Sequence, residues 1–80
     1  MKYHVALIYG TGTVQCWANG HRKDTVVVEM SRDIDAMSTD IHAYLGIRDT
    51  TKAAVKADKS NMLAWINKEF GKDFKRLVVT

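Results

Sequence analysis

Residues 3–18 read YHVALIYGTGTVQCWA, two runs of alternating apolar and polar residues on either side of a glycine-containing segment. Alternation with a period of two is typical of β-strands whose two faces differ in polarity. If Gly10 and Thr11 form a two-residue type II′ turn, Leu7 pairs with Val14 and the apolar faces of both strands coincide. A turn centred one residue later shifts the register by two and keeps the same faces. This stretch therefore predicts an antiparallel hairpin.

A third strand is expected over residues 25–30, where apolar residues again alternate. Pairing Cys16 with Val28 continues the apolar face across this strand. That register leaves residues 19–25 as a protruding loop. The loop carries a basic triplet, His21, Arg22 and Lys23.

Residues 31–46 have the spacing of an amphipathic helix, with Ser31 as its expected N-cap and Gly46 as its stop. The apolar positions of this helix are Ile34, Met37, Ile41, Tyr44 and Leu45, and the acids of its first turn are Asp33 and Asp35. Residues 48–59 fit two interpretations. Alternating Ala53, Val55 and Ala57 favour a short strand, whereas the Ala/Lys composition suits a helix. We take the strand as the prediction.

A second helix is expected from a cap at Asp58 or Ser60 to Phe70, ended by Gly71, with Met62 and Ile66 on its inner face. Residues 74–80 read as a closing strand. The whole chain, residues 1–80, is then a single compact α+β domain. Its expected architecture is a three-stranded antiparallel meander, two helices on one face and a closing C-terminal strand, in the order βββα(β)αβ. Because so small a core gains stability from association, a homodimer is expected.

The charges are unevenly distributed along the chain. Residues 1–46 carry a net charge of −1 and residues 47–80 a net charge of +4. Clustered lysine and arginine suit the phosphates of a nucleic acid. Trp17, on the face opposite the helices, is a candidate for base stacking. The candidate nucleic-acid-binding residues are Arg22, Lys23, Lys52, Lys56, Lys59, Lys68, Lys72, Lys75, Arg76, Trp17 and His21.

The motifs of common sites are missing from the sequence. The Gly-Thr-Gly of residues 10–12 lacks the third glycine and the following helix of a dinucleotide site. The histidines and Cys16 have no metal-ligand spacing, and Cys16 is expected to face the core. The sequence also lacks the GxxG loop of a KH module. We therefore expect neither an enzyme, nor a cofactor, nor a metal site.

The leading hypothesis is a small basic nucleic-acid-binding regulatory or accessory protein that prefers RNA to DNA. The alternative is a protein-binding inhibitor or antitoxin-like adaptor that uses the open sheet face or the first helix. With a single cysteine, no signal-peptide pattern and no long apolar run, we expect a cytoplasmic location and no membrane partner. Its size would suit a viral or mobile-element accessory protein.

Overall fold

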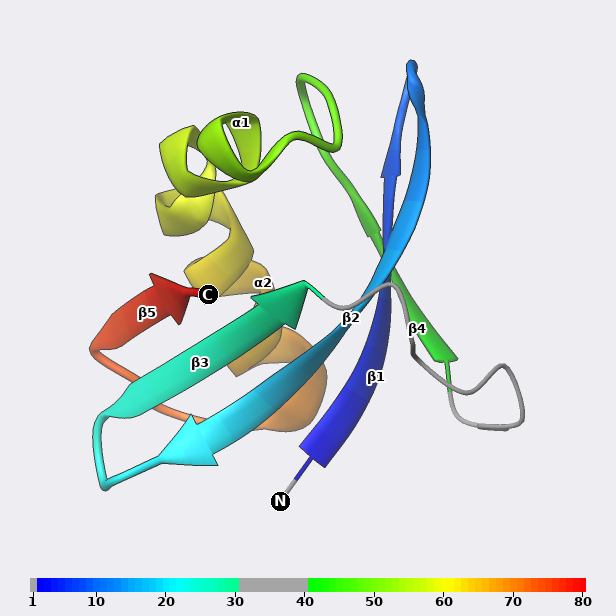
Figure 1. The fold of residues 1–80 in the computed structure, drawn as a ribbon. Helices are drawn as coiled ribbons and strands as arrows, with labels where there is room; N and C mark the ends of the chain where they lie inside the picture. The colour runs from blue at the N-terminus through cyan, green and yellow to red at the C-terminus, as the bar shows by residue number, and fades with distance from the viewer. Residues whose placement is uncertain (1, 31–40) are drawn as a thin grey trace.

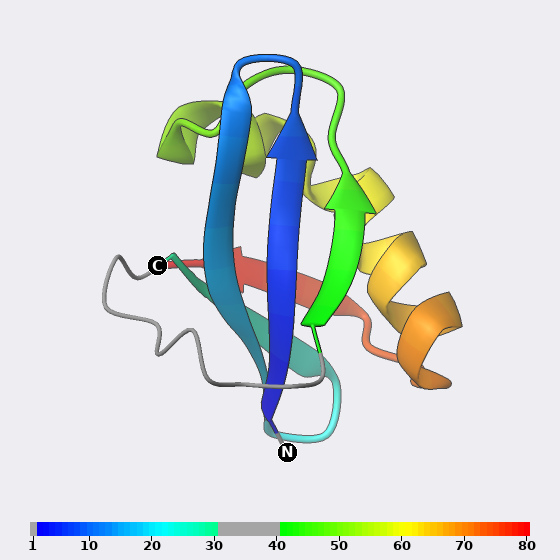
Figure 2. The ribbon, with the colours of Figure 1, turned by 90° about the vertical axis from the view of Figure 1, so that its right-hand side faces the viewer.

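The computed structural model describes residues 2–30 and 41–80, which form an α+β fold with a five-stranded sheet and two helices (Figure 1). The elements are β1 (Lys2–Tyr9), β2 (Gly12–His21), β3 (Thr25–Met30), β4 (Ile41–Leu45), α1 (Lys52–Ala57), α2 (Lys59–Phe70) and β5 (Arg76–Val79). The strand order is β4-β1-β2-β3-β5. The expected antiparallel meander β1-β2-β3 forms the centre, but β4 and β5 join its two sides as parallel partners of β1 and β3. The sheet is therefore mixed, and it twists strongly, so that β3 and β5 cross the direction of β1 and β4 (Figure 2).

The β1–β2 hairpin has the first of the two registers that the sequence allowed. Leu7 pairs with Val14, and the strands close at Tyr9 opposite Gly12. The predicted turn type is wrong, however. A type II′ turn needs a positive φ at its first central residue, Gly10, whereas in this turn the positive φ, 148°, belongs to Gly12.

The predicted pairing of β2 with β3 is wrong by two residues, although the predicted faces are right. Cys16 pairs with Met30 and Ala18 with Val28. Pairing continues to His21 opposite Thr25, so the connection shrinks to residues 22–24. The tighter loop satisfies more backbone groups of β2 and β3 than the expected protruding loop would.

The predicted helix over residues 31–46 is wrong in its second half, where residues 41–45 form β4. Residues 31–40, including Ser31, Asp33, Ile34, Asp35 and Met37, lie outside the described residues. Tyr44 faces the core and is buried, while Ile41 and Leu45 face the opposite side of the sheet and are exposed. Gly46 serves packing instead of helix termination, because a Cβ there would collide with the ring of Tyr9.

The strand predicted within residues 48–59 is also wrong, because residues 52–57 form α1. Thr51 caps this helix, its hydroxyl accepting a hydrogen bond from the Ala54 N–H at 3.2 Å. Adjacent Ala54 and Val55 are both buried, which an alternating strand would not allow. Helix propensity and the cap thus outweigh the short alternation.

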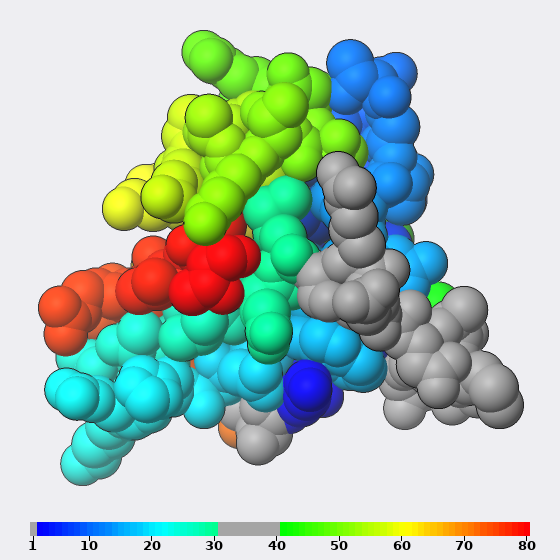
Figure 3. Space-filling model, viewed as in Figure 1, coloured from blue at the N-terminus to red at the C-terminus, as the bar shows by residue number. Residues whose placement is uncertain are grey.

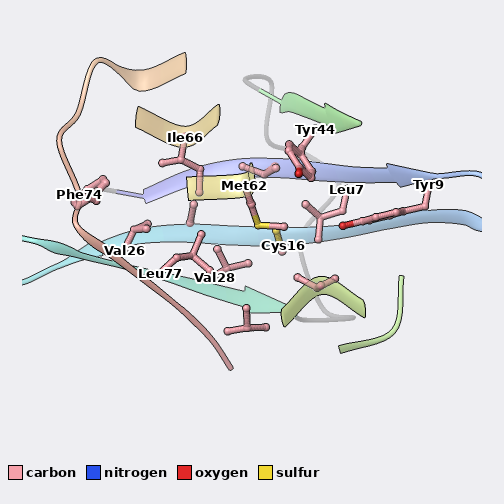
Figure 4. Packing of buried hydrophobic residues seen from close by; sticks show 14 residues of the cluster. Leu7, Tyr9, Cys16, Val26, Val28, Tyr44, Met62, Ile66, Phe74 and Leu77 are labelled. Atoms are coloured by element: carbon pink, nitrogen blue, oxygen red, sulfur yellow. The ribbon is translucent and has the colours of Figure 1, made fainter. Parts of the chain in front are cut away.

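The predictions for α2 and β5 are confirmed. The helix ends at Gly71, whose left-handed φ of 62° is the usual helix stop. Met62 and Ile66 of α2 are buried against the sheet, and Leu77 and Val79 of β5 point to the same core. Both helices cover one face of the sheet, and the hydrophobic core lies between the helices and this face (Figures 2 and 4).

Candidate nucleic-acid interface

The β2–β3 loop is fixed to the start of β5 by a shared backbone acceptor. The carbonyl of Asp24 accepts hydrogen bonds from the N–H of Lys75 at 2.7 Å and the N–H of Arg76 at 3.0 Å. Asp24 also accepts through its carboxylate from the Thr25 hydroxyl at 3.1 Å. Arg22, within the loop, has a φ of 62°, a left-handed conformation that costs energy for a residue other than glycine. The contacts to β5 help to hold the loop in this conformation.

The segment between α2 and β5 is held by a side-chain clasp. The Asn67 side chain donates to the Phe74 carbonyl at 3.0 Å and accepts from the Phe74 N–H at 2.8 Å. The Asn67 carbonyl also accepts from the Lys72 N–H at 2.9 Å. Because Phe74 is buried, the clasp is partly shielded from water, and it orders the chain on both sides of Asp73.

These two attachments gather five cations at one corner, which we call the basic corner: Arg22, Lys23, Lys72, Lys75 and Arg76. Four of them line a hollow of about 530 Å³ together with Asp24 and Asp73. A neighbouring hollow of about 220 Å³ places His21 and Arg76 together.

The charges of the basic corner are only partly compensated. The Lys75 ammonium lies 3.0 Å from an Asp73 oxygen, and the Arg76 guanidinium lies 4.0 Å from Asp24. Both pairs are exposed, and such pairs contribute little to stability. Within the described ranges, Arg22, Lys23 and Lys72 have no ion pair. The corner thus offers positive charge to an anionic ligand.

The other predicted cations do not line the two hollows of the basic corner. Lys52 and Lys56 are exposed on α1, at the opposite end of the fold from the β2–β3 loop (Figure 1). Lys68 is exposed in the last turn of α2. Lys59 begins α2 and lies beside the start of β5, near Lys75 and Arg76.

Trp17 lies on the sheet face that the helices leave uncovered, and it is half-buried. The His4 ring lies 5.0 Å from its ring, and the Lys2 ammonium lies 4.6 Å from the ring centre. Glu29 is its cross-strand partner on β3. These neighbours surround the indole, and Trp17 lines neither of the two hollows of the basic corner.

A buried polar network under α2 was not anticipated from the sequence. The carboxyl of Asp58, 2% exposed, accepts hydrogen bonds from the Tyr44 hydroxyl at 2.6 Å and the Asn61 amide at 2.8 Å. Burial, followed by the hydrogen bond to Asp58, raises the pKa of Tyr44. Packing in the core and these hydrogen bonds account for both groups.

Cys16 is buried in the core, and burial raises the pKa of its thiol to about 12. The nucleophilic thiolate is therefore scarce at neutral pH. Among residues 2–30 and 41–80, no group of three or more His, Cys, Asp or Glu side chains could hold a metal ion.

In comparisons with known proteins, no family model, no curated protein and no solved structure matches this chain. Over the described residues, neither helix has the length and apolar character needed to cross a membrane.

Proposed function

We propose that the protein binds nucleic acid, RNA in preference to DNA, through phosphate contacts at the basic corner. The observation that carries the proposal is the attachment of the β2–β3 loop to β5 through the Asp24 carbonyl. It joins Arg22 and Lys23 to cations that lie some fifty residues later in the chain. A corner already ordered in the free protein loses little conformational entropy when it binds.

The chemistry of the basic corner favours recognition of the phosphate backbone of a nucleic acid. Lysine and arginine side chains contact phosphates whatever the base sequence, so affinity depends on charge and shape. The corner continues through His21 and Arg76 onto the sheet face opposite the helices. Unstacked bases of single-stranded RNA can lie on such a face, which is why RNA is the preferred target.

Fluorescence anisotropy with a labelled single-stranded RNA and a duplex DNA of equal length tests the proposal. Affinity for RNA should exceed that for DNA and fall steeply between about 50 and 200 mM salt. Each single-strand phosphate contact contributes about 0.7 to the slope of log affinity against log salt. The pair Lys23→Gln/Lys72→Gln should therefore lower the magnitude of this slope by about 1.4.

The matched control is Lys52→Gln/Lys56→Gln, which removes the same charge at the far end of the fold. It should leave the slope almost unchanged. Salt-insensitive binding, or equal effects of both pairs, would contradict the proposal. Light scattering measures the mass of the complex and so tests whether the protein binds as the expected homodimer.

A further inference from the structure

The outer edge of β5 carries backbone groups that the sheet does not use. Arg76 and Thr80 direct their N–H groups toward the β3 side, to the carbonyls of Asp24 and Val28. Neighbouring residues of a strand direct their backbone groups to alternate sides. Leu77 and Val79 therefore direct their N–H and C=O groups away from β3, where the described chain provides no further strand.

A hollow of about 310 Å³ lies along this edge, between β5 and the first turns of α2. Leu63 and Leu77 give it an apolar floor, and Val78 lines it from β5. Lys59, Lys75 and Arg76 line it as well and supply a cationic rim. Figure 3 shows β5 at the surface below the start of α2.

We propose that this β5 groove binds an extended acidic and aliphatic segment of a partner protein by strand addition. An added strand would satisfy the backbone groups of Leu77 and Val79. Its side chains would alternate between the two faces of the sheet. Aliphatic residues would then meet Leu63 and Leu77 on the helix side, and acidic residues would lie beside Arg76.

Charge and backbone hydrogen bonding favour this occupant over a second copy of the chain and over a nucleic acid. A second copy of the chain would bring its own Lys75 and Arg76 to the same edge, and like charges oppose that pairing. A nucleic acid would suit the cationic rim, but it offers no regular ladder of N–H and C=O groups to the β5 backbone. The apolar floor and the free ladder together fit a peptide strand.

The probe is the fluorescein-labelled peptide acetyl-EVEVEVE-amide, titrated into the full-length protein. Its binding should shift the amide NMR signals of Leu77 and Val79 and slow their hydrogen exchange at least about tenfold. The lysine counterpart acetyl-KVKVKVK-amide should not bind, because the rim repels it. If neither amide responds to the acidic peptide up to about 1 mM, the proposal is overturned.

Backbone methylation of the peptide supplies a control that leaves the protein unchanged. In a paired strand, only one of the two alternating sets of N–H groups can face β5. Two peptides are compared, one N-methylated at every valine and the other at every glutamate. One of the two should bind at least about tenfold more weakly than the unmodified peptide, and the other should bind as the unmodified peptide does. Equal effects of the two would overturn strand addition.

Variants of the protein distinguish peptide binding in this groove from RNA binding at the basic corner, although the two sites share Lys75 and Arg76. Arg76→Glu should weaken peptide binding at least about fivefold, whereas Lys52→Glu, the same charge change on α1, should not. The pair Lys23→Gln/Lys72→Gln should leave peptide binding unchanged, whatever its effect on RNA. A labelled RNA that protects the Leu77 and Val79 amides in place of the peptide would overturn the proposal.

Discussion

At the scale of single residues, two buried tyrosines with opposite hydrogen bonding predict opposite mutational effects. The Tyr44 hydroxyl donates to the buried Asp58 carboxyl at 2.6 Å. The Tyr9 hydroxyl is equally buried but has no hydrogen-bond partner in the described part of the chain. Tyr44→Phe should lower the free energy of unfolding by about 1.5–3 kcal/mol, because it removes a hydrogen bond to a buried carboxyl.

Tyr9→Phe is the matched control, since it deletes the same atom from a similar environment. It should be neutral or raise the free energy of unfolding by up to about 1 kcal/mol, because an unpaired hydroxyl no longer has to be buried. Urea denaturation at pH 7 measures both values. Similar losses in the two variants would show that the Asp58 contact is not what distinguishes them.

Cys16 makes the stability depend on pH in the alkaline range. Burial raises the pKa of its thiol to about 12, whereas an unfolded chain has a cysteine pKa of about 8.5. Stabilisation by the buried neutral thiol is complete below about pH 8.5 and is lost as pH rises toward 12. The loss approaches about 1.4 kcal/mol per pH unit.

Urea unfolding at several pH values between 7.5 and 10 tests this dependence. Cys16→Ala should flatten the decline in this range, although it lowers stability overall by leaving a small cavity. Tyr9 and Tyr44, whose pKa values are also raised by burial, should still cause a decline above about pH 10 in the variant. An unchanged slope in Cys16→Ala would rule out the thiol as its source.

At the scale of elements, the end of β4 depends on a glycine that makes room for a ring. The Gly46 N–H donates to the Ile8 carbonyl at 2.8 Å, which extends the pairing of β4 with β1. Gly46→Ala should cost about 1–3 kcal/mol, because the new methyl group must displace the Tyr9 ring from the core. Thermal unfolding followed by circular dichroism measures the loss.

Gly10→Ala provides the comparison at the β1–β2 turn. A Cβ at Gly10 would have no atom within 4 Å, and Gly10 does not have a positive φ. Its stability should change by less than about 0.5 kcal/mol. A large loss at Gly10 together with a small loss at Gly46 would contradict this view of the two glycines.

The elements that were predictable are those whose apolar faces had one interpretation. The faces of β1 and β2 follow from local alternation, which left two registers open, and the end of α2 follows from its apolar spacing and Gly71. Residues 41–45 have a spacing that also suits a helix, and their partner β1 lies far away in sequence. The parallel pairing of β4 is therefore a tertiary effect that local periodicity does not contain.

At the scale of the whole molecule, composition indicated the cations but could not indicate their grouping. The sequence places Arg22 and Lys23 on a loop, and Lys72 and Lys75 just after the glycine that ends α2. Their convergence depends on the parallel pairing of β3 with β5, which only the topology supplies. Asp24 and Asn67 position these cations, yet as single polar residues they gave no sequence signal.

The topology also predicts how the chain folds. The parallel pairs of β1 with β4 and of β3 with β5 join strands that are distant in sequence, so non-local contacts must form before the sheet is complete. We expect refolding on a scale of about milliseconds to seconds. The sequence contains no proline, so a phase of about 10–100 s from prolyl isomerisation should be missing.

Stopped-flow fluorescence after dilution from urea measures this rate through Trp17 and Trp65. These two reporters lie on opposite faces of the sheet: Trp17 beside His4 on the face opposite the helices, Trp65 against Tyr44 on the helix side. Because both faces depend on the same strand pairings, Trp17→Phe and Trp65→Phe should each leave a single exponential with similar rates. Different rates would mean that the two faces form in separate steps, and a phase lasting minutes would contradict the prediction outright.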